Sequence, residues 1–234
     1  MPLPVINAPT YELTIPSTGQ TVQYRPFLVK EEKILLMANE GGEASEIVRA
    51  MKQIIGNCIQ NGYNTDNMPL FDVEYIFLKL RSKSVNEFSE VGFRCPECDE
   101  VNRVQIDLSG VEISVDDTHS NKVELTNDIG LIMKYPQLDS VNINDLESND
   151  VNVVFEVISS CIDSIYQGEE IHDSGDYTKQ EISEFINNLT QEQFLKIQQF
   201  FDTMPKLSHT VPYKCGKCEY DEPLLLEGLQ NFFA

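Results

Sequence analysis

The sequence is short of positive charge. Only 17 of its 234 residues are Lys or Arg, against 38 Asp or Glu, and the formal net charge is −21. A protein that grips a nucleic-acid backbone normally needs a basic patch that displaces counterions from phosphate. Sequence-specific binding of nucleic acid is therefore not expected. The same charge favours docking onto more basic protein surfaces.

Long apolar runs are also missing. The run at residues 34–38 is among the longest, whereas a membrane span needs roughly 20 apolar residues. The first five residues carry no charge and no apolar core segment, so they do not resemble a secretory signal. We therefore expect no transmembrane segment, and synthesis in the cytoplasm, where cysteines stay reduced.

The residues of common catalytic sites are scarce. There are three histidines, His119, His172 and His209, and they lie far apart in the sequence. The sequence contains no Gly-rich phosphate loop and no Gly-x-Ser-x-Gly motif. These absences favour a protein that is not an enzyme.

Against this background, four of the six cysteines form two Cys-x-x-Cys pairs, Cys95 with Cys98 and Cys215 with Cys218. Each pair lies at a turn between two stretches with strand-like alternation. Two intervening residues let both sulfurs face one cation, and two such knuckles give a closed tetrahedral site of four thiolate ligands. The pattern predicts one structural zinc ion per chain, with zinc–sulfur distances near roughly 2.3 Å.

Other states of these cysteines stay open. A [4Fe-4S] cluster is the runner-up, followed by paired disulfides or free thiols. Residues 99–214 separate the two pairs, far more than the roughly 15–20 residues usual between such knuckles. A metal ion would therefore close a long loop. Cys58 and Cys161 fall within apolar helical patterns, and we expect them to be buried core residues without a metal or redox role.

The periodicity of apolar residues predicts the elements of the chain. Residues 10–29 read as a hairpin with its turn at residues 16–19. Helices are expected over 30–39, 43–61 and 71–83, and strands over 90–115. Further strands are expected at 122–125, 129–135 and 221–226, a helix over Val151 to Tyr166 ended by Gly168, and two helices opened by capping boxes at Thr178 and Thr190.

These elements predict an α+β fold: a helical core with an N-terminal β-hairpin and a split zinc-ribbon-like β element formed by the two knuckles. We expect four parts. They are an N-terminal hairpin and helical region (1–89), the split β element (90–125 and 206–227), an inserted mainly helical region (126–205) and an apolar C-terminal segment (228–234).

Several stretches together resemble the baseplate hub family of T-even-type contractile-tailed bacteriophages. The similarity runs from about residue 13 to the end of the chain. It rests on both cysteine pairs and on residues 13–19 (LTIPSTG), 24–33 (YRPFLVKEEK), 71–78 (FDVEYIFL), 80–84 (LRSKS) and 133–136 (MKYP).

The resemblance implies a structural, non-enzymatic virion component of the tail baseplate that acts in hub assembly and is made in the host cytoplasm. The implied partners are other baseplate hub proteins, tail tube proteins and, as a further candidate, tape-measure proteins, within a large hetero-oligomeric assembly. The alternative function is a zinc-ribbon assembly chaperone or adaptor that leaves before the particle is finished. A peptidoglycan hydrolase is a third and weaker hypothesis.

Two sets of residues are candidates for contacts with partners. Basic residues beside the aromatic-rich helices are scarce enough to matter, although charges that only stabilise helix ends would look the same. The apolar C-terminus either inserts into a partner or packs on this chain's own core. The candidates are Lys30, Lys33, Arg81 and Lys83 in the first set, and Leu229, Phe232 and Phe233 in the second.

Overall fold

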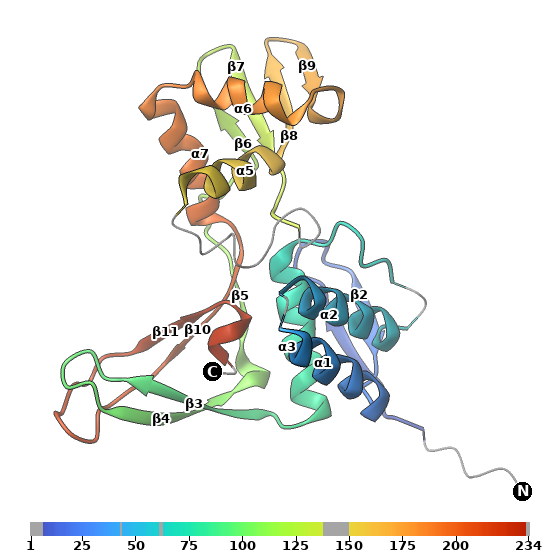
Figure 1. Ribbon diagram of the computed structural model, residues 1–234, viewed down its shortest axis with the longest axis vertical. Helices are drawn as coiled ribbons and strands as arrows, with labels where there is room; N and C mark the ends of the chain where they lie inside the picture. Colours follow the sequence, from blue (N-terminus) through green and yellow to red (C-terminus); the bar gives the residue numbers. More distant parts are fainter. Residues whose placement is uncertain (1–6, 43, 61–62, 138–149, 233–234) are drawn as a thin grey trace, which may run out of the picture. The chain divides into compact units, whose positions relative to one another are not determined.

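The computed structural model shows a mixed fold of helices and strands, in agreement with the predicted class (Figure 1). It describes residues 7–42, 44–60, 63–137 and 150–232. None of the helices within these ranges is long and apolar enough to cross a membrane. The chain divides into two compact units: unit 1 comprises Met1–Asp66, Phe71–Ser114 and Lys206–Ala234, and unit 2 comprises Asn67–Leu70 and Val115–Pro205.

Unit 1 begins with the predicted hairpin, in which strand β1 (Tyr11–Thr14) pairs with strand β2 (Thr21–Tyr24). Gly19 has a φ of +67°, a conformation that glycine adopts without steric cost, and it closes the turn between the strands. The buried carboxylate of Asp72 accepts hydrogen bonds from the backbone N–H and the hydroxyl of Ser17 in this turn. A residue of the third helix therefore holds the hairpin in place.

The three helices of unit 1 agree with the sequence pattern. They are α1 (Val29–Gly41), α2 (Ala44–Cys58) and α3 (Leu70–Ser84). Helix α3 is apolar on more than one face, and ten of its residues are buried, as expected for a helix inside the core. Its polar side chains are bonded to remote segments: Lys79 Nζ donates to the carbonyl oxygens of Ser109 and Val111 at 2.8 Å each, and Glu74 Oε1 accepts from Leu229 N at 3.1 Å.

The β part of unit 1 combines strands that precede residues 115–205 in the sequence with strands that follow them. Strands β3 (Phe88–Arg94) and β4 (Val101–Asp107) form an antiparallel ribbon. A second sheet has the order β11-β10-β5, from Leu224–Glu227, Lys206–Val211 and Glu112–Ser114. In this sheet, Ser114 is the direct partner of Lys206. The two ends of the chain segment that forms most of unit 2 therefore leave from neighbouring positions.

Unit 2 contains a four-stranded antiparallel sheet in the order β6-β7-β8-β9. Strand β6 is Lys122–Glu124, β7 is Ile129–Met133, β8 is Ile162–Gln167 and β9 is Glu170–Asp173. Helices α5 (Val151–Ser160), α6 (Lys179–Asn187) and α7 (Gln191–Thr203) belong to the same unit. Its core consists of buried apolar side chains, among them Leu131, Ile162, Ile186, Ile197 and Phe200.

Both predicted capping boxes are confirmed at the starts of α6 and α7. The Thr178 hydroxyl accepts from Glu181 N, while Glu181 Oε2 accepts from Thr178 N at 2.8 Å. Thr190 and Gln193 repeat the arrangement. Each box satisfies backbone N–H groups that the first turn of a helix leaves without partners. The local sequence therefore fixes where these helices begin.

The helix predicted over Val151 to Tyr166 is wrong in its second half. Helix α5 ends at Ser160, and β8 follows it directly. Gly168, expected to end the helix, has a φ of +61° and lies in the short turn between β8 and β9. Apolar residues at 158, 161, 162 and 165 fit both a helix and a buried strand. Pairing with β7 and β9 decides for the strand, so residues 126–205 contain a sheet as well as the expected helices.

Candidate metal centre

The first cysteine pair forms the turn between β3 and β4. Cys95 N donates to Glu100 O at 2.9 Å, and Asp99 N donates to Cys95 O at 2.9 Å. Asp99 has a φ of +59°, in the left-handed region that non-glycine residues seldom enter. The chain therefore turns back sharply after Cys98, and both sulfurs lie on the same side of the loop.

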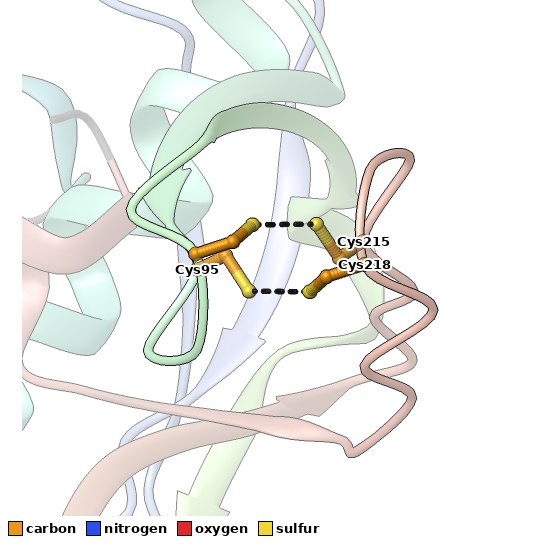
Figure 2. Close-up of side chains that lie close together, drawn as sticks. Cys95, Cys215 and Cys218 are labelled. Carbon is orange, nitrogen blue, oxygen red and sulfur yellow. Dashed lines mark hydrogen bonds between the residues drawn. The ribbon is translucent and has the colours of Figure 1, made fainter.

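The second pair lies in the connection between β10 and β11 and repeats this geometry. Cys215 N donates to Tyr220 O at 2.8 Å, the same spacing of donor and acceptor as in the first knuckle. Glu219 has a φ of +63° and corresponds to Asp99. Figure 2 shows the two knuckles facing each other, with the sulfurs of each pair directed toward the other.

The sulfur geometry fits a single metal ion. All four Sγ atoms lie within 4.8 Å of one another. The distance from Cys95 Sγ to Cys218 Sγ is 3.5 Å and that from Cys98 Sγ to Cys215 Sγ is 3.6 Å. A regular tetrahedron with zinc–sulfur distances of about 2.3 Å has edges of about 3.8 Å, whereas a disulfide bond is about 2.05 Å long. All four cysteines are free thiols spaced like the ligands of one ion.

The electrostatics of the thiols also favour a cation. Backbone N–H groups of Lys217 and Cys218 donate to Cys215 Sγ and lower the pKa of that thiol to about 6. At Cys218, the N–H of Tyr220 lowers the pKa, but desolvation and the other three sulfurs raise it to about 12. The pKa is lowered at Cys95 and Cys215 and raised at Cys98 and Cys218, because a charged sulfur opposes ionisation of its neighbours. A dication removes this conflict because it stabilises all four thiolates together.

The surroundings leave the site closed on one side and exposed on the other. Cys95, Cys215 and Tyr213 are buried together, with Phe93, Val104 and Leu224 packed against them. Cys218 is exposed at the rim. Four cysteine ligands leave no coordination position for a substrate, so the arrangement suits a structural ion rather than a catalytic one.

The remaining two cysteines are buried, as the sequence predicts, although Cys161 lies just after the end of α5 and not within a helix. Cys58 and Cys161 are each 1% exposed. Burial raises the pKa of each thiol to about 11, which keeps them protonated and unreactive at neutral pH. Their predicted burial is confirmed, and neither belongs to the sulfur cluster.

The basic partner-contact candidates differ in accessibility. Lys33 is exposed on α1, as is Lys30, whose Nζ lies 3.4 Å from Glu31 Oε1. Lys83 forms an ion pair with Glu87, and its Nζ lies 5.4 Å from the centre of the Tyr11 ring. Arg81 is partly buried, and desolvation lowers its pKa.

The C-terminal candidates lie against this chain. Phe232 is completely buried, and its carbonyl oxygen accepts a hydrogen bond from the Ser89 hydroxyl at 2.7 Å. Leu229 donates its backbone N–H to Glu74 and is partly buried. Phe233 lies outside the described residues. The described part of this segment is therefore engaged within unit 1.

Comparison with known proteins assigns the family. The profile of a family described as "T4 bacteriophage base plate protein" matches residues 8–234. The chain belongs to this baseplate protein family. It is also 22% identical to the "Baseplate hub assembly protein gp26" of Enterobacteria phage T4, over 95% of this chain and 97% of the relative. No solved structure matches the chain significantly.

Membership of the baseplate protein family gives the chain a structural role in the phage tail baseplate. The relative is named for assembly of the hub and not for a catalytic activity. This agrees with the expectation of a non-enzymatic protein drawn from the scarcity of catalytic motifs. The resemblance to a baseplate family inferred from the sequence is confirmed.

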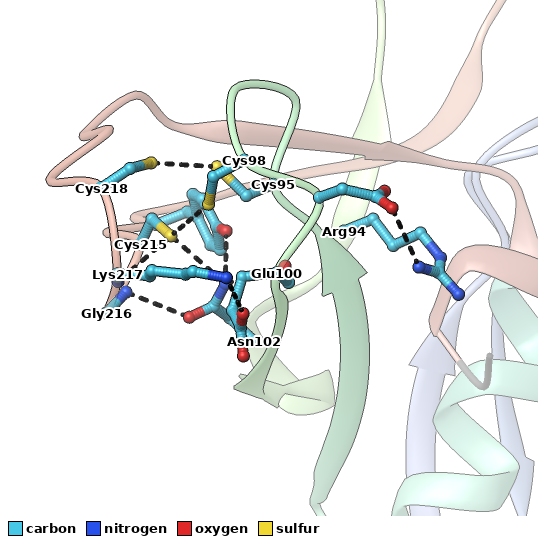
Figure 3. Close-up of polar contacts among 11 residues, drawn as sticks. Arg94, Cys95, Cys98, Glu100, Asn102, Cys215, Gly216, Lys217 and Cys218 are labelled. Atoms are coloured by element: carbon cyan, nitrogen blue, oxygen red, sulfur yellow. Dashed lines mark hydrogen bonds and ion pairs between the residues drawn. The ribbon is translucent and has the colours of Figure 1, made fainter.

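The role of one residue at the site, Asn102, cannot be recognised from the sequence. The side chain of Asn102 on β4 reaches across to the second knuckle and contacts both Gly216 and Cys215 (Figure 3). A polar residue on an exposed strand is ordinary in a sequence. Only the spatial meeting of the two knuckles distinguishes it from its neighbours on the ribbon.

Proposed function

We propose that this protein is a structural component of the phage tail baseplate hub that acts in hub assembly through protein–protein contacts, with one structural zinc ion bound by the two knuckles. The observation that carries the assembly role is the match over nearly the whole length of both chains to a baseplate hub assembly protein. Other hub proteins and tail tube proteins are the proposed partners, with tape-measure proteins as a further candidate.

The separation of the sulfurs supports zinc over an iron–sulfur cluster. A [4Fe-4S] cluster is bound by four cysteine thiolates that are spread over separate iron atoms. Here, two sulfur pairs lie at 3.5 and 3.6 Å, as expected for ligands that share one ion. Elemental analysis of protein purified without added metal should find about one zinc per chain. Iron with visible cluster absorbance, or no metal, would contradict the zinc assignment.

A tightly bound structural ion suits a protein that must keep one shape while it binds its partners. One knuckle precedes residues 115–205 in the sequence and the other follows them. An ion bound by both knuckles would join these two segments. Zinc binding to small peptides is worth roughly 10–16 kcal/mol, which is an upper guide for a protein with its own core. The proposed role of the ion is to keep the β part of unit 1 in one shape for its partners.

Among the basic candidates, Lys30 and Lys33 are the ones we propose for contact with acidic partner surfaces. Both are exposed on α1, and the exposed apolar residues Leu36 and Met37 follow Lys33 by one helical turn. Charge reversal by Lys30→Glu together with Lys33→Glu should weaken co-purification with hub proteins and reduce its salt dependence. Lys179→Glu, an exposed lysine of unit 2, is the matched control. Equal binding of the double variant and the control would remove this surface from the proposal.

The alternative function is an assembly chaperone that does not remain in the particle. The word "assembly" in the name of the relative is compatible with either role. Quantitative mass spectrometry of purified phage particles separates them, because a hub component is retained in a fixed ratio to other baseplate proteins. Absence from finished particles, combined with failure of hub assembly when the gene is removed, would establish the alternative.

A further inference from the structure

One side chain bridges the two halves of the cysteine site. Asn102 belongs to β4, which follows the first knuckle, and it contacts the second knuckle through both ends of its amide (Figure 3). Its Oδ1 accepts from Gly216 N at 3.1 Å. Its Nδ2 lies 3.6 Å from Cys215 Sγ and 2.9 Å from the hydroxyl oxygen of Tyr213.

The surrounding groups fix the orientation of this amide. Gly216 N–H can only donate, so it requires the amide oxygen. On the other side, the carbonyl oxygen of Glu100 lies 3.1 Å from Nδ2 and can only accept. A reversed amide would place an NH2 group against an N–H and an oxygen against a carbonyl. The donating end of Asn102 therefore faces Cys215 Sγ.

The bridge runs in one direction only. The two knuckles are otherwise equivalent, but Pro96 occupies the position in the first knuckle that Gly216 occupies in the second. Proline has no N–H to donate. The position equivalent to Asn102 is Glu222, whose carboxylate accepts from the Tyr220 hydroxyl instead. The amide contact therefore runs from the first half of the site to the second, whereas Glu222 bonds within its own half.

We infer that Asn102 is a positioning residue for the metal centre: its amide holds the second knuckle against the first so that four sulfurs converge on one ion. This inference rests on the proposed metal site. The Gly216 contact fixes the position of the loop, and the Nδ2 group directs a donor at one of the ligand sulfurs. Groups that hydrogen-bond metal ligands typically change metal affinity by 10- to 100-fold when they are replaced.

An ion pair also connects the two knuckles, but we expect it to contribute less to their relative position than Asn102 does. Lys217 Nζ forms an ion pair with Glu100 Oε2 at 2.8 Å, and both side chains are largely solvent-accessible. Exposed ion pairs contribute little, because water and salt screen them. Asn102 is partly buried and makes directed hydrogen bonds to the loop itself.

The first test measures metal affinity in the full-length chain. Asn102→Ala should weaken zinc binding by about 10- to 100-fold in competition with a chromophoric chelator. With cobalt as a probe, the thiolate charge-transfer bands should require correspondingly more metal. Gln105→Ala on the same strand is the matched control, since Gln105 is exposed, and it should bind zinc as the unaltered protein does. Unchanged affinity in Asn102→Ala would overturn the inference.

A second set of variants separates positioning from simple packing. Asn102→Asp keeps the shape and the acceptor but loses the donor toward Cys215, so zinc affinity should fall in this variant too. Gly216→Pro removes the N–H and copies the first knuckle, whereas Gly216→Ala keeps the N–H, and the added Cβ would lie an ordinary 3.6 Å from Asn102 Oδ1. Gly216→Pro should weaken zinc binding and Gly216→Ala should not.

The outcomes distinguish this inference from the proposed function. If the unaltered protein binds no metal, the proposed site fails, and the role of Asn102 fails with it. If the unaltered protein binds zinc and full affinity persists in Asn102→Asp and Gly216→Pro, only the role of Asn102 is overturned. Combining Asn102→Ala with Gly216→Pro should weaken binding by less than the product of the two separate effects, because both remove the same hydrogen bond.

Discussion

The two units of the chain are assembled differently, although both bury an apolar core. Unit 2 is built almost entirely from one continuous segment, and its core consists of apolar side chains from a sheet and capped helices. Unit 1 is assembled from three separate stretches of chain. Its remote segments are joined by polar contacts, including those of Lys79 and Glu74, and by the four cysteines.

Directed contacts matter most where distant parts of the chain must meet in a fixed alignment. Elements close in sequence meet at a smaller entropic cost than elements far apart, and apolar burial acts on both without direction. Segments that are far apart in sequence require contacts that fix a register as well as an approach. In unit 1, helix α3 and the cysteine site supply such contacts, and the following experiments break them one at a time.

Removal of the metal should have the largest effect, and it should be confined to unit 1. A strong chelator, or Cys98→Ser, removes the link between the knuckles and should lower stability by several kcal/mol, below the roughly 10–16 kcal/mol of zinc peptides. Hydrogen exchange followed by mass spectrometry should show faster exchange in β3, β4, β10 and β11. Helices α6 and α7 should remain protected.

Two cysteines provide the control for this experiment. Cys58→Ala and Cys161→Ala should each reduce stability but leave zinc content unchanged, because neither is a ligand in the proposed site. Equal loss of protection in both units on chelation would show that the ion does not act locally.

Lys79→Met should have the next largest effect. Lys79 is 9% exposed and donates to two backbone carbonyl oxygens next to β5. Methionine fills the space but leaves both acceptors without this partner, which should cost about 2–4 kcal/mol. Chemical denaturation at neutral pH measures the change. Lys33→Met, at an exposed site, should be nearly neutral, and a comparable loss there would argue against a specific role for Lys79.

Gly130→Ala tests unit 2 in the same way. Gly130 is the ladder partner of Tyr166, and an added Cβ would overlap both the Tyr166 ring and the backbone oxygen of Val123. The backbone of β6 cannot move away without loss of pairing, so a destabilisation of about 1–3 kcal/mol is expected. Zinc content should stay the same. Faster exchange should appear in β6–β8, and a loss of zinc would show that the two units are not independent.

Glu74→Gln should change the pH dependence of stability. Desolvation raises the pKa of Glu74 to about 7, although the Leu229 N–H opposes the shift. Between pH 4.5 and 7, the folded state binds more protons than the unfolded state, so this group's contribution to stability falls as pH rises. Glutamine remains neutral and keeps an acceptor for Leu229. The variant should be more stable at pH 8, by on the order of 1–2 kcal/mol.

Urea denaturation at several pH values checks this expectation. The stability curve of Glu74→Gln should be flatter than that of the unaltered protein between pH 5 and 8. Glu32→Gln, at an exposed position of the same unit, should leave the curve unchanged. If both variants behave alike, Glu74 does not govern the pH dependence of stability.

Local features of the fold can be predicted from the sequence. The hairpin turn, the capping boxes at Thr178 and Thr190, and helix α3 each depend on residues within a few positions of one another. The two cysteine pairs are equally visible, because reduced cysteines separated by two residues are typical of a metal-binding knuckle. Strand β8 is harder to predict because its apolar residues fit two periodicities, and only pairing with β7 and β9 decides between them.

The other contacts join residues that are far apart in the sequence. Nothing near Asn102 in the sequence indicates that it faces Gly216, because more than one hundred residues separate them. The same holds for Lys79 with Ser109 and Val111, where a lysine in an apolar helix gives no indication of its acceptors. Such contacts follow from tertiary structure alone.

Ser114 and Lys206, which directly precede and follow residues 115–205, are paired across two antiparallel strands. The Cα atoms of directly paired antiparallel residues lie only about 4.5–5.5 Å apart. Even a tight two-residue turn can span this distance, so the pairing of β5 with β10 sets no minimum length for the segment between them. The segment Val115–Pro205 therefore begins and ends beside one pair of residues of unit 1, and the register of β5 with β10 does not depend on the length of that segment.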